Sequence, residues 1–419
     1  MNIAVIAPTE IPAIRANTMQ VMKMAQALVV LGHQVRLVAP GKCPTEDRAT
    51  TDLDSPGIRI RRNPKDVQDA IWERLSHHYG IKHQFAIDWL PAAPRLRRYD
   101  YGLRTVLWAR DRKAELLNTR LPQSAAIAST MGMATILETH DLPQGYFGSW
   151  IFLRFFKGKG ARRLVVITQA LAMDISKKLG VDCSPPFTVI APDGVDLERY
   201  SHLPEPAGAR MALIQDKGAH FANRLPVDRF TVGYTGHLYK GRGAEMFLEL
   251  AARLPEFTFL IVGGEPQDVS HLQGVVNTLN IDNIILTGFI PNSELPHYQT
   301  ACDVLIMPYQ LRVAASSGGD ISRYLSPMKL FEYLACERAI ISSDLPVLQE
   351  VLNSQNAILL SGEDIDSWVG ALRKLHLDPA LRKKLAIQAR QDANLYTWES
   401  RATRILEGLD SDLHSTRKV

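Results

Sequence analysis

The sequence predicts an α/β protein built from two Rossmann-like, doubly wound domains that face each other across a cleft. The chain has 419 residues, which is more than one hydrophobic core usually serves, so two domains of about 200 residues each are expected. Short apolar strands alternate with helical stretches in each half of the chain, which is typical of parallel sheets covered by helices. Residues 192–227, between the two series, are rich in proline, glycine and charge.

The first series begins at the amino terminus. Residues 3–7 and 35–38 are predicted as buried strands, and residues 18–31 between them as a helix that ends at Gly32. This spacing is typical of a parallel βαβ unit. Residues 65–117 mix aromatic side chains, arginine and a proline-containing break, and we expect helices and loops there. Further buried strands are predicted at residues 134–137, 164–167 and 189–190.

The second series begins at Phe230. A helix is predicted at residues 244–254, and the region 381–409 is predicted to be helical. The strands are predicted at residues 231–236, 257–262, 284–286, 304–307 and 339–343. These patterns divide the chain into an amino-terminal domain (1–195), a hinge (196–228), a carboxyl-terminal domain (229–395) and a final helix (396–419). They leave open whether that helix returns to the amino-terminal domain.

The cysteines and the amino terminus both indicate a cytoplasmic protein. Four cysteines are scattered without any Cys-x-x-Cys pair, which argues against a disulfide framework and against a zinc site. The chain opens directly into a predicted strand, with no basic leader and no cleavage signal. It also lacks a run of 18 apolar residues, so no membrane span is expected.

Positive charge is concentrated in the first half. Residues 1–200 hold 27 lysines and arginines against 19 aspartates and glutamates, whereas the remainder holds 21 against 25. One basic cluster follows the apolar and aromatic run 150–156. Basic residues beside exposed aromatic residues suit an anionic membrane surface, at the inner face of the membrane, or an anionic acceptor; a solvated surface beside a core helix is the alternative. No binding motif supports nucleic acid. The clusters are Arg59, Arg61 and Arg62; Arg95, Arg97 and Arg98; and Lys157, Lys159, Arg162 and Arg163.

Residues 326–344 carry the strongest functional signal. Ser326 is a good N-cap and Pro327 suits the first helical position, so a helix followed by a buried strand is expected. A helix N-terminus favours a diphosphate, and a glycine turn before it, at 316–320, lets backbone approach a ligand. Within that helix, Glu332 is placed to accept hydrogen bonds from a ribose diol. A sugar-nucleotide site is one interpretation, and an ordinary βαβ unit with a surface glutamate is the other.

Glycine-containing turns follow several strands of the second half. The turn 236–243 holds three glycines together with His237, Lys240 and Arg242. Such donors suit a leaving diphosphate, where negative charge builds up in the transition state. The Walker order of residues is absent. Two further turns, Gly263-Gly-Glu265 and Gly288-Phe-Ile-Pro291, follow the next strands, and Phe289 in the second lies where backbone could meet a base.

The first strand leads into a different kind of loop. A dinucleotide domain would show Gly-x-Gly-x-x-Gly after this strand, and its absence argues against NAD or FAD and so against an oxidoreductase. Arg15 with Asn17 or Thr18 at the next helix start fits an anion or a sugar hydroxyl, with plain helix capping as the alternative. His140 follows the strand 134–137 and should point into the cleft, where it could donate to a phosphate or orient a sugar; a structural loop histidine is equally compatible.

Metal-dependent chemistry is disfavoured by the sequence. An Asp-x-Asp pair occurs at Asp364 and Asp366, but it lies at the start of a late, polar helix. No such pair stands in a loop that suits a divalent cation. We therefore expect no metal and no cofactor, with a UDP- or GDP-linked sugar as a substrate.

Together these motifs resemble the retaining, nucleotide-sugar-dependent glycosyltransferases of family four, which have the two-domain GT-B fold. The resemblance covers nearly the whole chain and is most specific in the carboxyl-terminal block. It rests on the following segments: Arg15-Ala-Asn-Thr18, Glu138-Thr-His140, Val189-Ile-Ala-Pro-Asp-Gly-Val-Asp196, Tyr234-Thr-Gly236, residues 240–243, Gly263-Gly-Glu265, Pro327-Met-Lys-Leu-Phe-Glu332-Tyr and Asp344-Leu-Pro346.

The resemblance implies that the second half binds the donor and the first half binds the acceptor. Catalytic roles are implied for His140, Lys240 and Arg242, and acceptor contacts for Arg15, Asn17 and Thr18. A hydroxyl acceptor, anionic or lipid-linked, is implied as the second substrate. The donor-binding residues are Gly236, His237, Gly263, Gly264, Glu265, Phe289, Gly319, Asp320, Ser326, Lys329, Leu330 and Glu332.

The sequence departs from the family pattern at two places. Family members often carry a second glutamate eight positions before the one that matches Glu332, and Tyr324 stands there; Asp320 could replace its contacts with the donor sugar. Glu337 replaces the usual glycine after the helix. The function expected is sugar transfer with retained configuration, in glycolipid, polysaccharide or other glycoconjugate synthesis. The alternatives are a sugar-nucleotide epimerase of similar fold and a glycosyltransferase-like protein that only binds.

Overall fold

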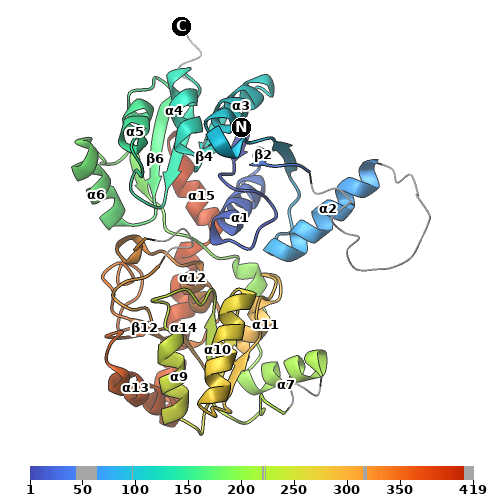
Figure 1. Cartoon of the computed structure of the whole chain (residues 1–419), viewed down its shortest axis with the longest axis vertical. Helices are drawn as coiled ribbons and strands as arrows, with labels where there is room; N and C mark the ends of the chain where they lie inside the picture. The colour runs from blue at the N-terminus through green and yellow to red at the C-terminus, as the bar shows by residue number, and fades with distance from the viewer. Residues whose placement is uncertain (44–63, 97, 219–220, 222, 315–318, 410–419) are drawn as a thin grey trace. The chain divides into compact units, whose positions relative to one another are not determined.

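The computed structural model describes residues 1–43, 64–96, 98–218, 221, 223–314 and 319–409 (Figure 1). The predicted basic residues Arg59, Arg61, Arg62 and Arg97 lie outside the described residues, as do residues 316–318 of the predicted glycine turn. The chain forms two compact units. One comprises Met1–Ala191 with the segment from Trp398 onward, and the other comprises Pro192–Thr397.

The first unit is built on a seven-stranded sheet in the order β3-β2-β1-β4-β5-β6-β7. Every neighbouring pair in it is parallel. Its strands are β1 (Asn2–Ile6), β2 (Gln34–Pro40), β3 (Ala86–Leu90), β4 (Leu116–Thr119), β5 (Thr135–Thr139), β6 (Ala161–Val166) and β7 (Thr188–Ile190). Its helices are α1 (Ala16–Val30), α2 (Pro64–Tyr79), α3 (Tyr99–Asp111), α4 (Pro122–Thr130), α5 (Gly148–Phe156), α6 (Gln169–Leu179) and α15 (Trp398–Leu406).

The second unit is built on a six-stranded parallel sheet in the order β10-β9-β8-β11-β12-β13. Its strands are β8 (Thr231–Thr235), β9 (Thr258–Val262), β10 (Ile284–Leu286), β11 (Val304–Met307), β12 (Ala339–Ser343) and β13 (Ile358–Leu360). Its helices are α7 (Pro206–Lys217), α9 (Ala244–Arg253), α10 (Pro266–Thr278), α11 (Leu295–Thr300), α12 (Met328–Ala335), α13 (Ile365–Leu377) and α14 (Pro379–Asp392). Short 3-10 turns lie at Pro94–Leu96, Leu197–Tyr200, Ser322–Tyr324 and Ala393–Tyr396.

The two sheets share one strand order, in which the chain adds strands in one direction and then crosses back to the other side of the first strand. Such a reversal lies between β1 and β4 in the first unit and between β8 and β11 in the second. In open α/β sheets, ligands bind at this point, outside the carboxyl ends of the strands. The predicted fold class, two Rossmann-like doubly wound α/β units, is confirmed.

The predicted strands are present, and three further strands were missed. β3 lies at the edge of its sheet, and its central residue is Asp88, which accepts a hydrogen bond from Trp108 Nε1 and pairs with Arg112. That polar residue and the partial burial of the strand hide the apolar pattern. β4 begins at the end of the stretch 65–117, which was expected to hold helices and loops, and continues to Thr119. β13 is a three-residue, half-buried edge strand.

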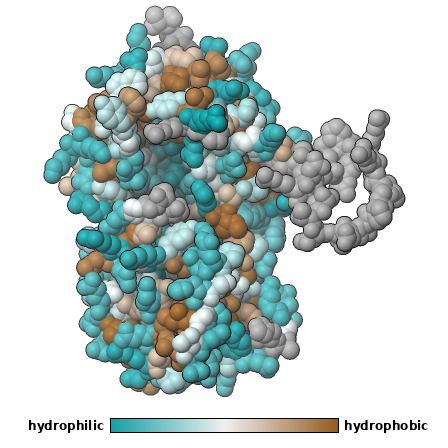
Figure 2. Space-filling view, viewed as in Figure 1, coloured by the Kyte–Doolittle hydropathy of each residue, from teal (hydrophilic) through white to brown (hydrophobic). Residues whose placement is uncertain are grey.

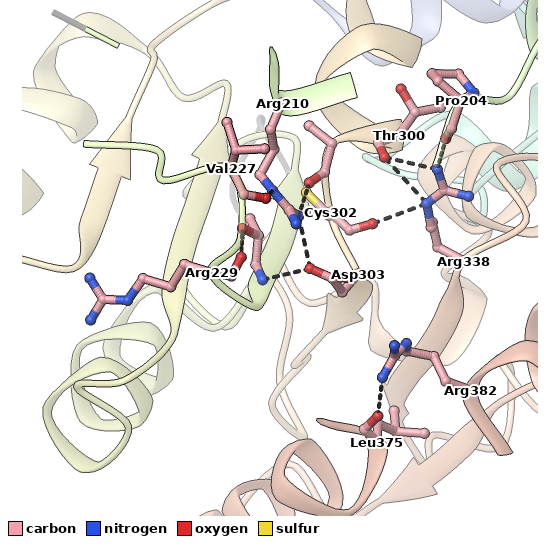
Figure 3. Close-up of polar contacts among 12 residues, drawn as sticks. Pro204, Arg210, Val227, Arg229, Thr300, Cys302, Asp303, Arg338, Leu375 and Arg382 are labelled. Atoms are coloured by element: carbon pink, nitrogen blue, oxygen red, sulfur yellow. Dashed lines mark hydrogen bonds and ion pairs between the residues drawn. The ribbon is translucent and has the colours of Figure 1, made fainter. Parts of the chain in front are cut away.

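Residues 196–228, for which the sequence predicts a hinge, lie in the second unit and include α7. Arg210 on α7 is buried, pairs with Asp303 at 2.8 Å and donates to the carbonyl oxygens of Val227 and Ala301 (Figure 3). Arg338 donates to the carbonyl oxygen of Pro204 from the other side of the same region (Figure 3). Buried guanidinium groups that are fully hydrogen-bonded fix backbone, so this segment is held against the sheet.

The last helix, α15, lies in the first unit and packs against α1. Its apolar side chains Ala402, Ile405 and Leu406 are buried. Arg163 on β6 donates to the carbonyl oxygens of Ile405 and Glu407, which holds the end of the helix. The first unit is therefore completed by residues from the far end of the chain.

Candidate active site

Glycines line the carboxyl edge of the second sheet. Gly236, Gly263 and Gly288 follow the neighbouring strands β8, β9 and β10, and all three have positive φ angles. A Cβ atom on Gly263 would lie 2.5 Å from the carbonyl oxygen of Gly236, so no other residue fits there. The Gly263 N–H donates to the Gly288 carbonyl oxygen at 2.8 Å. The ends of these three strands therefore lie close together, and a ligand can approach their backbone because the glycines have no side chains to cover it.

Lys329 lies at the point where this sheet reverses its strand order. It stands in the first turn of α12, and its Nζ atom lies 3.5 Å from the ring centre of Tyr234 at the end of β8 and 5.6 Å from that of Tyr309, just after β11. The side chain is buried. Burial, reinforced by the Arg242 charge and opposed by Glu332, holds the pKa of Lys329 well below its usual range. A Cβ on Gly236 would lie 2.7 Å from this Nζ, so a larger residue would displace the ammonium, and the φ of 131° also favours glycine.

A second cation and a histidine come from the turn between β8 and α9. His237 stacks on Tyr239, with ring centres 4.7 Å apart. The Cζ atom of Arg242 also contacts the Tyr239 ring, 5.4 Å from its centre. Tyr239 in turn donates to Glu265 at 2.7 Å. Burial, together with the charges of Arg242 and Lys329, lowers the pKa of His237 to about 4. His237 is therefore neutral at pH 7.

Four buried polar atoms of this region have no hydrogen-bond partner among the described residues: Lys329 Nζ, Arg242 Nε, His237 Nδ1 and Tyr309 Oη. Buried polar groups are nearly always paired, and a buried ammonium without a partner is costly. Lys329 and Arg242 each carry such an atom at the carboxyl edge of a parallel sheet, so they are suited to bind an anionic group. The arrangement can stabilise negative charge on a phosphate.

Other predicted donor residues have different surroundings. Glu332 is buried and accepts hydrogen bonds from Asn292 Nδ2 at 3.3 Å and Gln299 Nε2 at 3.1 Å, and its oxygens have capacity for further donors. Leu330 is buried in the core, so its side chain faces away from solvent. Phe289 is partly exposed beside Gly288. Lys240 lies on the same turn as Arg242, but its side chain is exposed; its catalytic role stays a prediction.

The start of α12 differs from the prediction. Helix α12 begins at Met328, its N-cap residue is Pro327, and that residue offers no side-chain cap. Ser326, predicted as the N-cap, accepts a hydrogen bond from the backbone N–H of Asp193 instead. The helix thus starts one residue later than predicted, because Pro327 has an extended ψ of 128° and precedes the first helical residue. Glu337, which stands where a glycine was expected after this helix, adopts a positive φ of 54°.

Asp320 lies beside Gly319 and is exposed. Its carboxylate accepts hydrogen bonds from the backbone N–H groups of Val313 and Ser322. The Ser322 contact is the larger cause that lowers the pKa of Asp320. The carboxylate therefore stabilises its own turn, and a contact with the donor sugar stays a prediction.

In the first unit, His140 belongs to a buried polar network rather than to an isolated loop. Its Nε2 atom lies 2.6 Å from Glu138 Oε1, and Glu138 is 2% exposed. Gln20 on α1 donates to the same oxygen at 2.6 Å, and Arg401 on α15 pairs with the carboxylate at 2.8 Å. Burial alone would raise the pKa of Glu138, but the Arg401 charge and the hydrogen bond from His140 hold it well below its usual range. Glu138 is therefore an anion.

The predicted acceptor residues surround the start of α1. The helix begins at Ala16, with Arg15 as its N-cap residue and no side-chain cap. Thr18 lies inside the helix, is buried, and donates to the carbonyl oxygens of Ala13 and Arg15, so neither Asn17 nor Thr18 caps it as predicted. Asn17 Oδ1 is buried without a partner among the described residues, whereas Arg15 is exposed.

Three further expectations concern what the chain lacks. Within the described residues, no group of three potential metal ligands lies together, and Asp364 caps α13 by accepting from the Ser367 N–H. No helix among those residues has the length and apolar character needed to cross a bilayer. The four cysteines, Cys43, Cys183, Cys302 and Cys336, are present as free thiols.

Comparison with known proteins identifies the second unit. Residues 229–378 match the family model described as glycosyl transferases group 1. Over these residues the chain is similar to the group 1 glycosyltransferases. The match covers the strand ends, the turn 236–243 and helix α12, so the glycine-lined edge, Lys329 and Arg242 all lie within the matched residues.

Individual relatives extend the likeness into the first half. The chain is 26% identical to the 2-deoxystreptamine glucosyltransferase of Streptomyces kanamyceticus, over 69% of this chain and 74% of that protein. It is 28% identical to a GDP-mannose-dependent phosphatidylinositol monomannoside mannosyltransferase of Mycolicibacterium smegmatis, over 52% of this chain and 54% of that one, about half its length. The solved structure of Anabaena Alr3699/HepE in complex with UDP superposes with a TM-score of 0.69 at 15% identity, and the likeness covers 98% of this chain and 100% of that chain. The GT-B fold is thereby confirmed.

Sequence reasoning missed the aromatic residues that hold the cations and the buried network in the first unit. Tyr239 stands between two predicted site residues, so its position in the glycine-containing turn could have identified it. Tyr234 and Tyr309 end strands at the reversal point, and the strand order was needed to find them. Arg401 is 263 residues from Glu138 along the chain, and no local pattern connects the two.

Proposed function

We propose that the protein is a retaining glycosyltransferase that moves a sugar from a nucleotide-sugar donor to a hydroxyl acceptor, without a metal or other cofactor. The observation that carries the proposal is the pair of cations at the reversal point of the second sheet, the buried Lys329 and the half-buried Arg242, within the residues that match the group 1 glycosyltransferases. Lys329 Nζ and Arg242 Nε have no hydrogen-bond acceptor among the described residues, and the oxygens of a diphosphate would supply acceptors for both. A protein of the same fold, Anabaena Alr3699/HepE, was solved in complex with UDP, which supports a nucleotide-linked donor.

The chemistry proposed requires little covalent participation by the protein. The acceptor hydroxyl attacks the anomeric carbon on the face that the diphosphate leaves, the bond to the diphosphate breaks, and a leaving phosphate oxygen takes the hydroxyl proton. Lys329, Arg242 and the N-terminus of α12 stabilise the charge that develops on the diphosphate. Glu332 binds the ribose and His140 contacts the transferred sugar. The remaining task is to hold two substrates in line.

A donor panel tests this function. The full chain is mixed with UDP-, GDP- and ADP-linked sugars, and the melting temperature is measured. A donor at 100 times its Kd should stabilise the protein by about 2.7 kcal/mol, which is a rise of about 5–10 °C for a domain of this size. Free sugars without a nucleotide are the control. A panel in which no nucleotide sugar raises the melting temperature would contradict the proposal, and the strongest donor identifies base and sugar together.

The exposed face of α5 supports an acceptor that is presented at an anionic membrane. Ile151 and Phe155 are buried, yet the opposite side of the helix carries Trp150, which is 63% exposed, followed four residues later by Arg154 and then by Lys157. The neighbouring helix α6 exposes Met173 with Lys177 four residues on (α5 and α6 lie side by side in Figure 1). Hydrophobic residues are interspersed with hydrophilic ones on the visible face of this unit (Figure 2). Aromatic residues beside cations suit the headgroup region of anionic lipid. We place the enzyme in the cytoplasm, at the inner face of the membrane.

Vesicle binding tests the membrane surface. The variant Arg154→Gln/Lys157→Gln should bind vesicles with phosphatidylglycerol about 30-fold more weakly than the unmodified protein, because each basic residue near an anionic surface contributes about 1 kcal/mol. Sedimentation with vesicles measures the effect. The matched control is Lys383→Gln/Lys384→Gln, which removes two exposed charges from α14 in the second unit. An equal loss of vesicle binding in both variants, or binding only to neutral vesicles, would contradict the proposal that this surface binds an anionic membrane.

A further inference from the structure

The buried network around Glu138 collects side chains from four separate segments. Glu138 itself ends β5 with His140 two residues on, Gln20 comes from α1, and Arg401 comes from α15. Arg120, after β4, donates to Gln20 Oε1 at 3.1 Å. Arg401 also donates to the carbonyl oxygen of Ala191 at 3.1 Å. The charged and titratable groups that face Glu138 are therefore Arg401, Arg120 and His140.

The charge balance of this network depends on Arg401. Glu138 is 2% exposed and Arg401 3% exposed, so neither charge has effective access to water. Arg401 meets the carboxylate with two nitrogens, Nη2 at 2.8 Å from Oε1 and Nη1 at 3.3 Å from Oε2. A buried carboxylate that loses such a partner takes up a proton, because desolvation penalises its charged form. Arg401 is thus the group that keeps Glu138 ionised.

An ionised Glu138 dictates the tautomer of His140. A carboxylate without a proton can only accept, and His140 Nε2 lies 2.6 Å from Glu138 Oε1, so Nε2 must be the nitrogen that carries hydrogen. In the neutral ring, the lone pair then lies on Nδ1. A hydrogen bond to one imidazole nitrogen sets the chemistry of the other. Were Glu138 protonated, the carboxyl could donate to Nε2 and the opposite tautomer would be allowed.

We propose that Arg401, supplied by the last helix of the chain, is a positioning residue for His140. It acts through Glu138, which it keeps in the form that fixes the orientation of the imidazole and the tautomer with hydrogen on Nε2. This rests on the proposed function only for the statement that His140 contacts the transferred sugar. The carboxyl-terminal helix thereby takes part in the chemistry as well as in the stability of the first unit.

The tautomer can be observed directly, without any measurement of activity. The full chain is labelled with ¹⁵N-histidine, and long-range ¹H–¹⁵N correlation spectra at pH 8 distinguish hydrogen on Nε2 from hydrogen on Nδ1. The His140 signals are assigned by their loss in His140→Gln. We expect the Nε2–H pattern in the unmodified protein. In Arg401→Gln we expect that pattern to be replaced by averaged or Nδ1–H shifts, and in Arg401→Lys, which keeps the charge, we expect it to be retained.

Activity and stability separate this role from a structural one. With the donor identified by the melting panel, Arg401→Gln should lower kcat by about 10- to 100-fold while the donor KM changes by less than twofold, because the donor residues lie in the other unit. The matched control is Arg404→Gln, an exposed residue three positions later on α15, which should change neither the tautomer nor kcat.

The outcomes are distinct. An Nδ1–H tautomer in the unmodified protein overturns the proposal at once, even if Arg401→Gln fails to fold. A folded Arg401→Gln variant that keeps the Nε2–H pattern overturns it as well. If the tautomer changes as expected and no nucleotide sugar is a substrate, the positioning role stands and the proposed transferase function fails.

Discussion

Replacing Arg242 by alanine is expected to lower kcat by about two to three powers of ten, with a smaller effect on the donor KM. A preorganised cation that faces the developing charge of a leaving group stabilises the transition state more than the ground state, and loss of one such donor costs about 10²- to 10³-fold. Arg242 is held for this task by its contact with the Tyr239 ring, and its Nε has no partner among the described residues. Steady-state transfer or donor hydrolysis measures the effect.

Two companion variants make this result decisive. Arg373→Ala removes an exposed arginine of α13 and should leave kcat unchanged. Lys240→Ala tests the sequence prediction for the neighbouring lysine, and together with Arg242→Ala it should cost several powers of ten if Lys240 reaches the diphosphate when donor binds. An Arg242→Ala enzyme within tenfold of the unmodified one would show that this cation does not act on the leaving group.

Replacing Lys329 by methionine is expected to stabilise the free protein and to abolish the rise in melting temperature that a donor causes. In the free protein the ammonium is buried without a hydrogen-bond partner among the described residues, and removing an unsatisfied buried group recovers about 1–3 kcal/mol. Methionine fills a similar volume against the rings of Tyr234 and Tyr309. The same substitution removes a cation from the diphosphate, so kcat should fall by about 10²- to 10³-fold.

The pH dependence gives this prediction a definite sign. The pKa of Lys329 is lowered in the folded protein, so between the folded and the unfolded pKa the unfolded chain binds more protons and the free energy of unfolding rises with pH. The stabilisation by Lys329→Met should therefore be largest at acidic pH and shrink as pH approaches the ordinary lysine pKa. Thermal melts at pH 6, 7.5 and 9 measure it. The control is the exposed lysine variant Lys383→Met, and a Lys329→Met variant that is less stable than the unmodified protein at every pH would contradict the burial argument.

The architecture was largely predictable, because it depends on patterns that are local in the chain. Buried strands such as β9 and β11 are mostly apolar runs bounded by turns, and their alternation with helices indicates a parallel sheet. The glycine turns after β8, β9 and β10 could be assigned to one edge because the carboxyl ends of parallel strands meet there. The edge strands β3 and β13 were missed since they are short or only half buried.

The chemistry of the site was predictable only in part. His237, Arg242 and Lys329 were found as residue types near glycine turns, but the burial of Lys329 against Tyr234 and Tyr309 depends on contacts between distant segments, which the sequence pattern does not show. Helix starts at α1 and α12 were each misplaced by one or two residues, since a serine, asparagine or threonine near a helix start can bond elsewhere. The pairing of Glu138 with Arg401 is non-local, and single-sequence patterns carry no information on such pairs.

The discontinuity of the first unit bears on how the protein is made. Its first 191 residues leave the ribosome long before α15 is synthesised, and until then Glu138 is a carboxylate without its arginine and the surface that receives Ile405 and Leu406 stays uncovered. The second unit is one continuous stretch, Pro192–Thr397, and has no such dependence. The first unit is therefore closed only after the second has been synthesised, so residues 1–191 need protection from aggregation in the interval.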